Sequence, residues 1–214
     1  MAKAVMISIH PEWVEKILSG EKTLEIRKNG PNLETLFKCY IYCTKAPKGW
    51  LRFSSPPVRL DTKVVAEFTC DKISQYEAEL WDDKTHESIC EIYKPDDFDE
   101  YGELEHRLIA QSNDPNWGNN PISKASCVSV RKLRKYLGTG FHEFTGWHIS
   151  GLKIYDQPKD LGEFYKAGTL NASDFEYQLY DGSGDPSRRS YASYLFTKAL
   201  RMPPQSWCYV EDVL

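Results

Sequence analysis

Alternating hydrophobic and polar positions predict short strands over much of the first 70 residues. In residues 4–9, Val5, Ile7 and Ile9 share one face of a strand, because successive side chains point to opposite sides. The same alternation, rich in β-branched and aromatic residues, predicts three further strands, over 23–28, 37–44 and 63–70. We therefore expect the N-terminal part of the chain to build a sheet.

A short helix is expected between the first and second of these strands. Pro11 suits the first helical position, where a missing N–H costs nothing, and Gly20 suits the position just past the helix end. Apolar residues recur between them at helical spacing, at Trp13, Val14, Ile17 and Leu18. The first 28 residues thus predict a strand, a helix, a glycine turn and a second strand.

Residues 74–137 are expected to form a largely helical insertion between strands. The hydrophobic period is weak over 74–92 and clearer from Ser126, where apolar residues recur near helical spacing. Strand character returns at 146–155 and again at 206–210. This order of elements predicts an α+β fold, with a small closed or half-closed β-barrel, flanking helices and the helical insertion.

Composition narrows the class of protein. The chain has 214 residues, and 41% of them are hydrophobic, which indicates a globular protein. No apolar run approaches the roughly 18 residues of a membrane-spanning helix. No cleavage signal precedes the first strand, so we expect a cytoplasmic protein without a membrane partner. The six cysteines show neither disulfide nor zinc spacing, so we expect free thiols and neither a metal nor a cofactor.

Charge is unevenly distributed along the chain. A net charge of −4 argues against broad, non-specific binding of nucleic acid, which needs many contacts to phosphate. Residues 82–105 hold ten acidic residues and two lysines, whereas residues 131–135 hold the most basic cluster. A local basic cleft therefore remains compatible with the acidic average.

The stretch from Lys16 to Arg27 carries the strongest candidate site. Alternation places Glu25 and Arg27 on one face of the second strand, roughly 6–7 Å apart. They can pair with each other, or they can share a polar ligand, with arginine donating and glutamate accepting hydrogen bonds. Lys22 reaches the same place if the geometry of the turn before the strand allows it. The residues alone leave both interpretations open.

Four further residues are candidates for contact with a ligand. His10 and His148 carry the side chain suited to acid–base chemistry near neutral pH. The Trp147 ring can stack on a base. Ser8 lies on the strand face that continues to His10. A structural role remains open for each of them.

Residues 17–27 resemble the ASCH family, whose signature is Gly-x-Lys-x-x-Glu-x-Arg. The match is position by position, at Gly20, Lys22, Glu25 and Arg27. Two further stretches, 146–158 and 204–210, are similar to a bacterial or prophage subgroup.

The resemblance covers roughly residues 4–164 and implies a division of the chain. An ASCH domain is expected over 1–164, with the helical insertion at about 74–137. Residues 165–214 are expected to be a C-terminal extension that returns a strand to the domain.

The resemblance also implies a PUA-like β-barrel with a cleft beside the first helix, where related barrels bind RNA or modified bases. Some members of the family are implied to be amidohydrolases acting on acylated cytidine, and others ribonucleases. In the small amidohydrolase branch, a lysine and a threonine three residues later carry the chemistry. Lys22 matches that lysine, but Glu25 stands at the threonine position, which makes binding the safer expectation.

The leading hypothesis is therefore a domain that binds RNA, a nucleotide or a modified nucleoside. Lys22 and Arg27 would donate to phosphate or a base edge, and Glu25 would accept from a base amine. One alternative is a hydrolase of a modified nucleoside or RNA, with Lys22 and Glu25 as its catalytic residues or a histidine as its acid or base. The other is a protein-interaction module that uses the acidic segment 82–105.

Overall fold

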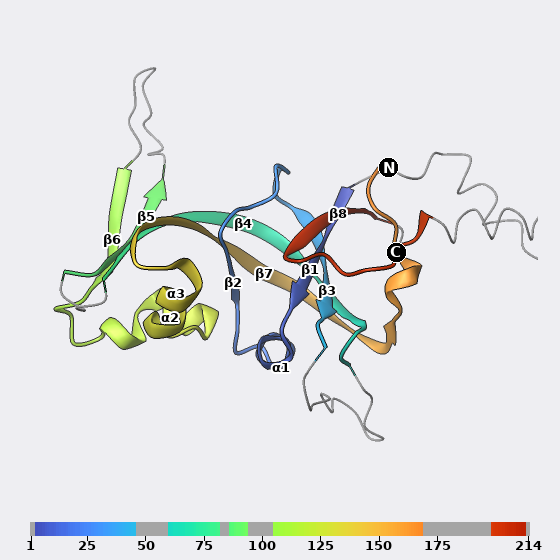
Figure 1. Ribbon diagram of the computed structural model, residues 1–214, viewed down its shortest axis with the longest axis horizontal. Coiled ribbons are helices and arrows are strands. Elements are labelled where there is room, and N and C mark those ends of the chain that lie inside the picture. Colours follow the sequence, from blue (N-terminus) through green and yellow to red (C-terminus); the bar gives the residue numbers. More distant parts are fainter. Residues whose placement is uncertain (1–2, 46–59, 82–85, 94–104, 169–197, 213–214) are drawn as a thin grey trace, which may run out of the picture. The chain divides into compact units, whose positions relative to one another are not determined.

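The computed structural model describes residues 3–45, 60–81, 86–93, 105–168 and 198–212. The chain divides into two compact units. Unit 1 comprises Met1–Leu18, Phe37–Thr69 and Gly151–Leu214, and unit 2 comprises Ser19–Leu36 and Cys70–Ser150. Two long strands, β4 (Val64–Leu80) and β7 (Gly140–Lys159), contribute residues to both units (Figure 1).

Unit 1 is built on neighbouring strands in the order β4, β3, β1 and β8. Its further elements are β1 (Lys3–Ile9), α1 (Pro11–Leu18), β3 (Phe37–Cys43), η2 (Leu161–Glu163) and β8 (Trp207–Glu211). In β1, Ile7 lies opposite Ile41 of the parallel strand β3 and opposite Trp207 of the antiparallel strand β8. The helix predicted after the first strand and the strand predicted near residue 206 are therefore both present.

The core of unit 1 forms around β1, which is buried from its second residue to its last. One cluster joins Met6 to Tyr40 and Phe164, whose rings meet edge to face with centroids 5.0 Å apart. The helix α1 buries Val14 and Ile17, as its apolar stripe predicted.

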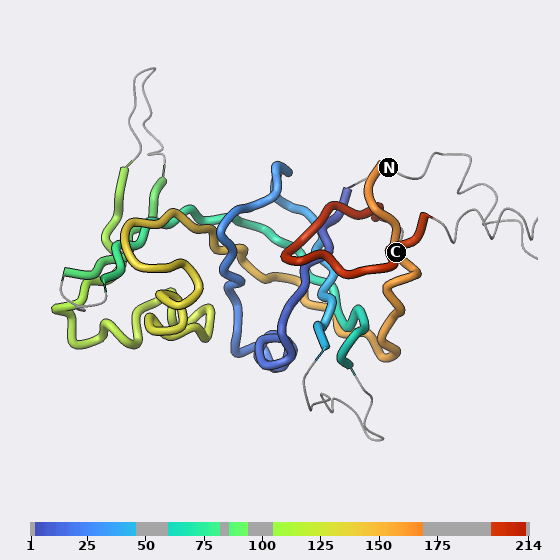
Figure 2. Tube along the Cα trace, viewed as in Figure 1, coloured from blue at the N-terminus to red at the C-terminus, as the bar shows by residue number. Residues whose placement is uncertain are grey.

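Unit 2 contains the strand order β2, β7 and β4, with β5 paired to β4 and β6 paired to β5. Its further elements are β2 (Leu24–Arg27), β5 (Ser88–Tyr93), β6 (Glu105–Gln111), η1 (Trp117–Asn119), α2 (Pro121–Ser126) and α3 (Val130–Leu137). β2 pairs antiparallel with β7, and β5 pairs antiparallel with both β4 and β6. Figure 2 traces the chain from β6 through α2 and α3 into β7.

One hydrophobic cluster joins the strands of unit 2 to its two α-helices. Leu24, Tyr76 and Phe144 of the strands belong to the same cluster as Ile122 of α2 and Leu133 of α3. The rings of Tyr76 and Phe144 stack with their centroids 5.2 Å apart. The helices therefore complete a core that the strands begin.

The prediction of a largely helical insertion at 74–137 is wrong for its first part. β4 continues to Leu80 and is followed by β5 and β6, and the described helices of this segment begin only at Trp117. Within β4, the buried residues Tyr76, Ala78 and Leu80 alternate with more exposed ones, which is the period of a strand. α3 lies where the helical spacing after Ser126 predicted a helix.

The fold is an α+β arrangement dominated by strands, but the described strands do not close into a barrel. Within each unit the strand order is a row with open ends. The predicted small β-barrel is therefore not confirmed. The boundary expected at residue 164, between a domain and a C-terminal extension, stays a prediction.

Helices of the described ranges are short, and the α-helices α1 and α3 have eight residues each. None of the helices that the structure describes is long and apolar enough to cross a membrane.

All six cysteines are free thiols, and Cys39, Cys43 and Cys70 are buried. Burial raises the pKa of the Cys43 thiol to about 12, and the negative charge of Asp61 adds to that effect. Burial likewise raises the pKa of Cys70 to about 12. Both thiols are therefore protonated at neutral pH, in the form that is a poor nucleophile.

Candidate functional site

The Lys22 side chain is buried at the junction between β2 and α2. Gly20 has a φ of 79°, in the left-handed region that favours glycine, and it begins the turn that leads to Lys22. The Lys22 ammonium donates to the backbone carbonyls of Leu24 and Ser126, at 2.8 and 2.7 Å, and lies 3.2 Å from Oε2 of Glu25. An ammonium has three N–H bonds, which these three acceptors match.

The Ser126 carbonyl belongs to the last residue of α2. Carbonyl groups at a helix C-terminus lack partners within the helix, and a positive charge is favourable there. Lys22 therefore fastens the start of β2 to the end of α2.

Glu25 and Arg27 complete the cluster around Lys22. Oε1 of Glu25 lies 2.9 Å from Nη2 of Arg27, while its other oxygen faces Lys22. The exposed fractions of Lys22, Glu25 and Arg27 are 2%, 6% and 9%. The hydroxyl of Thr145, on the neighbouring strand β7, donates to the Arg27 carbonyl at 3.1 Å. The structure thus brings the three predicted charges together and pairs them with one another.

This geometry is that of a buried, ion-paired cluster that holds β2 in place. A catalytic base or nucleophile needs a free lone pair and access to substrate, whereas the Lys22 ammonium is buried among acceptors. Contact of Lys22, Glu25 and Arg27 with a ligand stays a prediction, as does catalysis by Lys22 and Glu25.

Trp147 does not have the exposed ring that stacking on a base requires. Its exposed fraction is 0%, and Nε1 donates to Oγ1 of Thr145 at 3.1 Å. The indole fills the interior of unit 2 with its polar end satisfied, which is the usual state of a buried tryptophan. The stacking role expected for Trp147 stays a prediction, and in this structure the ring is part of the core of unit 2.

Ser8 and His10 belong to unit 1, whereas the other predicted site residues belong to unit 2. Ser8 is buried, and its hydroxyl donates to the carbonyl of Pro204 at 2.7 Å. His10 is exposed, and its carbonyl accepts the first backbone hydrogen bonds of α1. A site that combines these two residues with Lys22 stays a prediction.

His148 lines a pocket of about 250 Å³ that lies within unit 2. Apolar wall residues come from three different elements, namely Leu24, Ile109 and Ile122. Polar side chains converge on the same space, namely those of Lys72, Ser74, Glu91, Arg107 and His148. Its volume lies just below the usual range for small-ligand pockets, and a mostly apolar wall with a few convergent polar groups is typical of such pockets.

Glu91 is the buried centre of the polar side of this pocket. It forms ion pairs with Lys72, at 3.3 Å, and with Arg107. Burial by itself raises the pKa of Glu91, but hydrogen bonds from Arg107, Ser74 and Lys72 outweigh it and hold the pKa below its usual value. Both cations are exposed, so one carboxylate stands between two positive charges that solvent reaches.

His148 is a neutral imidazole inside the pocket. Its Nε2 lies 3.0 Å from the Ser74 hydroxyl, which is itself buried. Burial lowers the pKa of His148, and the positive charge of Lys72 lowers it further against the opposing effect of Asp71 and Glu91. A neutral imidazole has one hydrogen-bond donor and one acceptor; Ser74 engages Nε2, which leaves Nδ1 for a hydrogen bond to a ligand.

The lowered pKa of His148 predicts a pH dependence of stability. As the pH falls below about 6.5, the unfolded chain takes up a proton at this histidine before the folded chain does. Proton uptake by the unfolded state favours unfolding, so the free energy of unfolding falls between about pH 6.5 and the lower pKa of the folded state. Urea denaturation at pH 7.5 and pH 5.5 will show a smaller difference for His148→Gln than for the wild type. Equal differences in the two proteins contradict this prediction.

The sequence interpretation missed four of the polar residues of the pocket, namely Lys72, Ser74, Glu91 and Arg107. Residues 74–92 had been expected to be helical, which concealed the alternation that places Lys72, Ser74 and Tyr76 on one face of β4. That alternation is the signal that would have found part of the site. Pairing of β5 with β4 and β6 then brings in Glu91 and Arg107.

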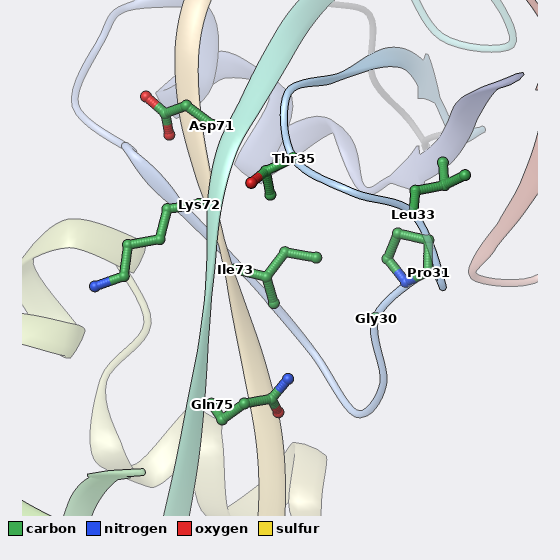
Figure 3. Close-up of a pocket in the computed structure, with 8 residues that line it drawn as sticks. All are labelled: Gly30, Pro31, Leu33, Thr35, Asp71, Lys72, Ile73 and Gln75. Carbon is green, nitrogen blue, oxygen red and sulfur yellow. The ribbon is translucent and has the colours of Figure 1, made fainter. Parts of the chain in front are cut away.

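A second pocket of unit 2, of about 420 Å³, lies between β4 and the segment 30–35. Figure 3 shows Ile73 and Gln75 on the side of β4 where Pro31 and Leu33 lie, while the ammonium of Lys72 points away from them. Within the described ranges, no group of three or more histidine, cysteine, aspartate or glutamate side chains is arranged to hold a metal ion.

Comparison with known proteins identifies one family. A solved structure of ASCH from Zymomonas mobilis is 16% identical, with a TM-score of 0.48, and the match covers 98% of this chain and 88% of that chain. Structures of two single-substitution variants of that protein are also 16% identical to this chain. The first has a TM-score of 0.46, and the match covers 98% of this chain and 89% of that chain. The second has a TM-score of 0.47, and the match covers 99% of this chain and 92% of that chain. No curated protein matches the chain.

The similarity to a prophage subgroup stays a prediction.

The model of the ASCH domain matches residues 7–166, which is more than half of the 214 residues. The chain therefore belongs to the ASCH domain family.

Proposed function

We propose that this ASCH domain protein binds a nucleotide, free or within RNA, and that the His148 pocket of unit 2 receives its base. The observation that carries the proposal is the convergence of a neutral imidazole, a buried hydroxyl and an ion-paired carboxylate on one small pocket. Membership of a family generally thought to bind RNA supports the same class of ligand.

The two ends of a nucleotide match the two sides of this pocket. The apolar side chains of Leu24, Ile109 and Ile122 offer contact to the faces of a base, and the His148 ring nitrogen that Ser74 does not contact offers one hydrogen bond to its edge. Lys72 and Arg107 are exposed and suit a phosphate, because arginine and lysine form charge-assisted hydrogen bonds with phosphate oxygens.

A residue of the family signature holds the backbone of a residue that lines this pocket. Thr23 and Leu24 line the pocket, and Lys22 donates to the Leu24 carbonyl. The Thr23 N–H donates to the carbonyl of Ala125, another lining residue, at 2.8 Å. Lys22, Glu25 and Arg27 thus set the position of a pocket wall.

Calorimetric titration of the protein with each of the four ribonucleoside monophosphates tests the proposal. Lys72→Gln and Arg107→Gln, made singly, each leave Glu91 one cation and keep the pocket intact. We expect each substitution to lower the affinity for the ligand that binds best by about tenfold or more, since a hydrogen bond to a charged group is worth roughly 1.5–3 kcal/mol. Lys45→Gln removes the same charge from an exposed site in unit 1 and is expected to bind as the wild type does. Wild-type affinity in both pocket variants would overturn the proposal.

The alternative is a hydrolase that acts on RNA or a modified nucleoside in the same pocket. The observation that favours it is the 3.0 Å contact between His148 and Ser74, because a neutral imidazole is a suitable general base. Incubation with RNA and with acylcytidine separates the two functions. Turnover that His148→Gln abolishes supports the hydrolase, and binding without turnover supports the binding domain. A protein-interaction role for the acidic segment 82–105 stays a prediction, since its residues 82–85 and 94–104 lie outside the described residues.

A further inference from the structure

We propose that the exposed face of α3, together with Lys28, binds the phosphate backbone of a single-stranded nucleic acid. This surface is called the α3 surface and consists of Lys28, Arg131, Lys132, Lys135 and Tyr136. The inference rests on the proposed function and extends it: the ligand is an oligonucleotide, of which one nucleotide occupies the His148 pocket.

The α3 surface is the polar half of an amphipathic helix. Val130, Leu133 and Leu137 are buried, and their spacing of three and four residues turns one face of the helix to the core. The other face presents Arg131 and Lys135, four residues apart, and is exposed.

The two charges in the first turn of this face, Arg131 and Lys132, are not placed to stabilise the helix, whereas Lys135 lies in the last turn, where the helix dipole favours a cation. Arg131 and Lys135 repel each other as like charges at positions i and i+4. Arg131 and Lys132 follow the N-cap Ser129, where the positive end of the helix dipole disfavours cations, and the first turn has no acidic residue. A partner that supplies negative charge would turn this arrangement from unfavourable to favourable.

Ion pairing distinguishes Arg131 and Lys135 from three other exposed or half-buried cations of unit 2. Lys72, Arg107 and Arg134 each form an ion pair with a carboxylate, and Arg134 on the same helix pairs with the buried Glu87. Among the residues that the structure describes, neither Arg131 nor Lys135 has a carboxylate partner. Arg131 and Lys135 therefore carry positive charge that no carboxylate of the described residues neutralises.

An exposed aromatic ring lies among these cations. Tyr136 is 43% exposed, and Nζ of Lys28 lies 5.4 Å from the centroid of its ring. Proteins that bind single strands combine a basic surface for the backbone with aromatic rings on which bases stack. This combination favours a nucleic acid over an acidic protein as the partner.

The α3 surface is close enough along the chain for one strand to reach both places. Ala125 lines the His148 pocket, and Arg131 follows it by six residues. Six residues span at most about 22 Å even when fully extended. A strand of a few nucleotides therefore suffices to place a base in the pocket and phosphates on α3.

Fluorescence anisotropy with a labelled 12-nucleotide RNA, measured over a range of salt concentrations, tests the inference. In Arg131→Gln/Lys135→Gln, two phosphate contacts are lost. The removal of like-charge repulsion offsets the loss of the favourable Lys135 charge in the last turn, so the helix is expected to keep its stability. The slope of log K against log[salt] should become shallower by about 1.4, because each contact to a single strand contributes roughly 0.7. The control Lys3→Gln/Lys45→Gln removes the same charge from exposed sites in unit 1 and should keep the wild-type slope.

Mononucleotide binding distinguishes the failure of this inference from that of the proposed function. The α3 variant should bind nucleoside monophosphates as the wild type does, whereas Arg107→Gln should weaken both ligands. If the salt slope of the α3 variant is unchanged while Arg107→Gln still binds nucleotide more weakly, the inference about α3 is overturned. The proposed function of the His148 pocket then still stands. Absence of mononucleotide binding in the wild type overturns the proposed function. As a second measurement, Tyr136→Ala should weaken RNA binding about tenfold, while Tyr136→Phe should retain it.

Discussion

Replacing Glu25 with alanine will lower the free energy of unfolding by about 3–5 kcal/mol, the usual cost of breaking a buried ion pair on one side. The carboxylate is the common partner of two buried cations, Lys22 and Arg27. Without it, two positive charges remain buried without their counter-ion. Urea denaturation of the variant and the wild type measures the loss.

Two further variants serve as a matched control and a conservative substitution for the Glu25 prediction. Glu143→Ala removes an exposed glutamate from β7 of the same unit and is expected to leave the stability nearly unchanged. Glu25→Gln keeps the shape and one acceptor, so it is the variant to measure if the alanine variant does not fold. A loss below about 1 kcal/mol in Glu25→Ala would show that the cluster does not hold β2.

Replacing Gly146 with alanine will lower the free energy of unfolding by about 1–3 kcal/mol, as overpacking of a core does. An added Cβ would lie 2.7 Å from Cε2 of Tyr76 and 2.9 Å from Cδ1 of Leu24. Real Cβ contacts are not that short, so the two side chains must move. Because both line the His148 pocket, the variant should also weaken ligand binding.

Gly118→Ala provides the matched control for this substitution. Its added Cβ would meet no atom within 4 Å, so the stability is expected to stay close to that of the wild type. Thermal denaturation of both variants tests the contrast. Equal melting temperatures for Gly146→Ala and Gly118→Ala would contradict the account of packing around Leu24 and Tyr76.

The strands β1, β2 and β3 and the helix α1 could be predicted from the sequence, because each is specified by local signals. Alternation gives the strands, and Pro11 and Gly20 mark the helix ends. The hairpin of β4 and β5 could not be predicted in the same way. Its Glu-Ala-Glu-Leu sequence at 77–80 contains good helix formers, and pairing with β5, the next strand in the chain, overrides that preference.

Only the part of the candidate site that lies within residues 16–27 could be predicted from the sequence. Spacing placed Glu25 and Arg27 together correctly, but it left Lys22 dependent on the geometry of the turn and did not show that the three side chains are buried. The carbonyl of Ser126 that accepts from Lys22 lies 104 residues away in the chain. His148 was a candidate from its residue type alone, and its partners Ser74 and Glu91 come from segments whose pairing depends on the tertiary fold.

The central claim is that the His148 pocket is where this ASCH domain binds a nucleotide. Ring resonances of the five histidines, recorded by NMR during titration with a nucleoside monophosphate, test it most directly. The resonance that disappears in His148→Gln identifies His148. The account predicts that this resonance shifts in a saturable way while that of His10, in unit 1, does not. Saturable binding that leaves the His148 resonance unmoved would contradict it.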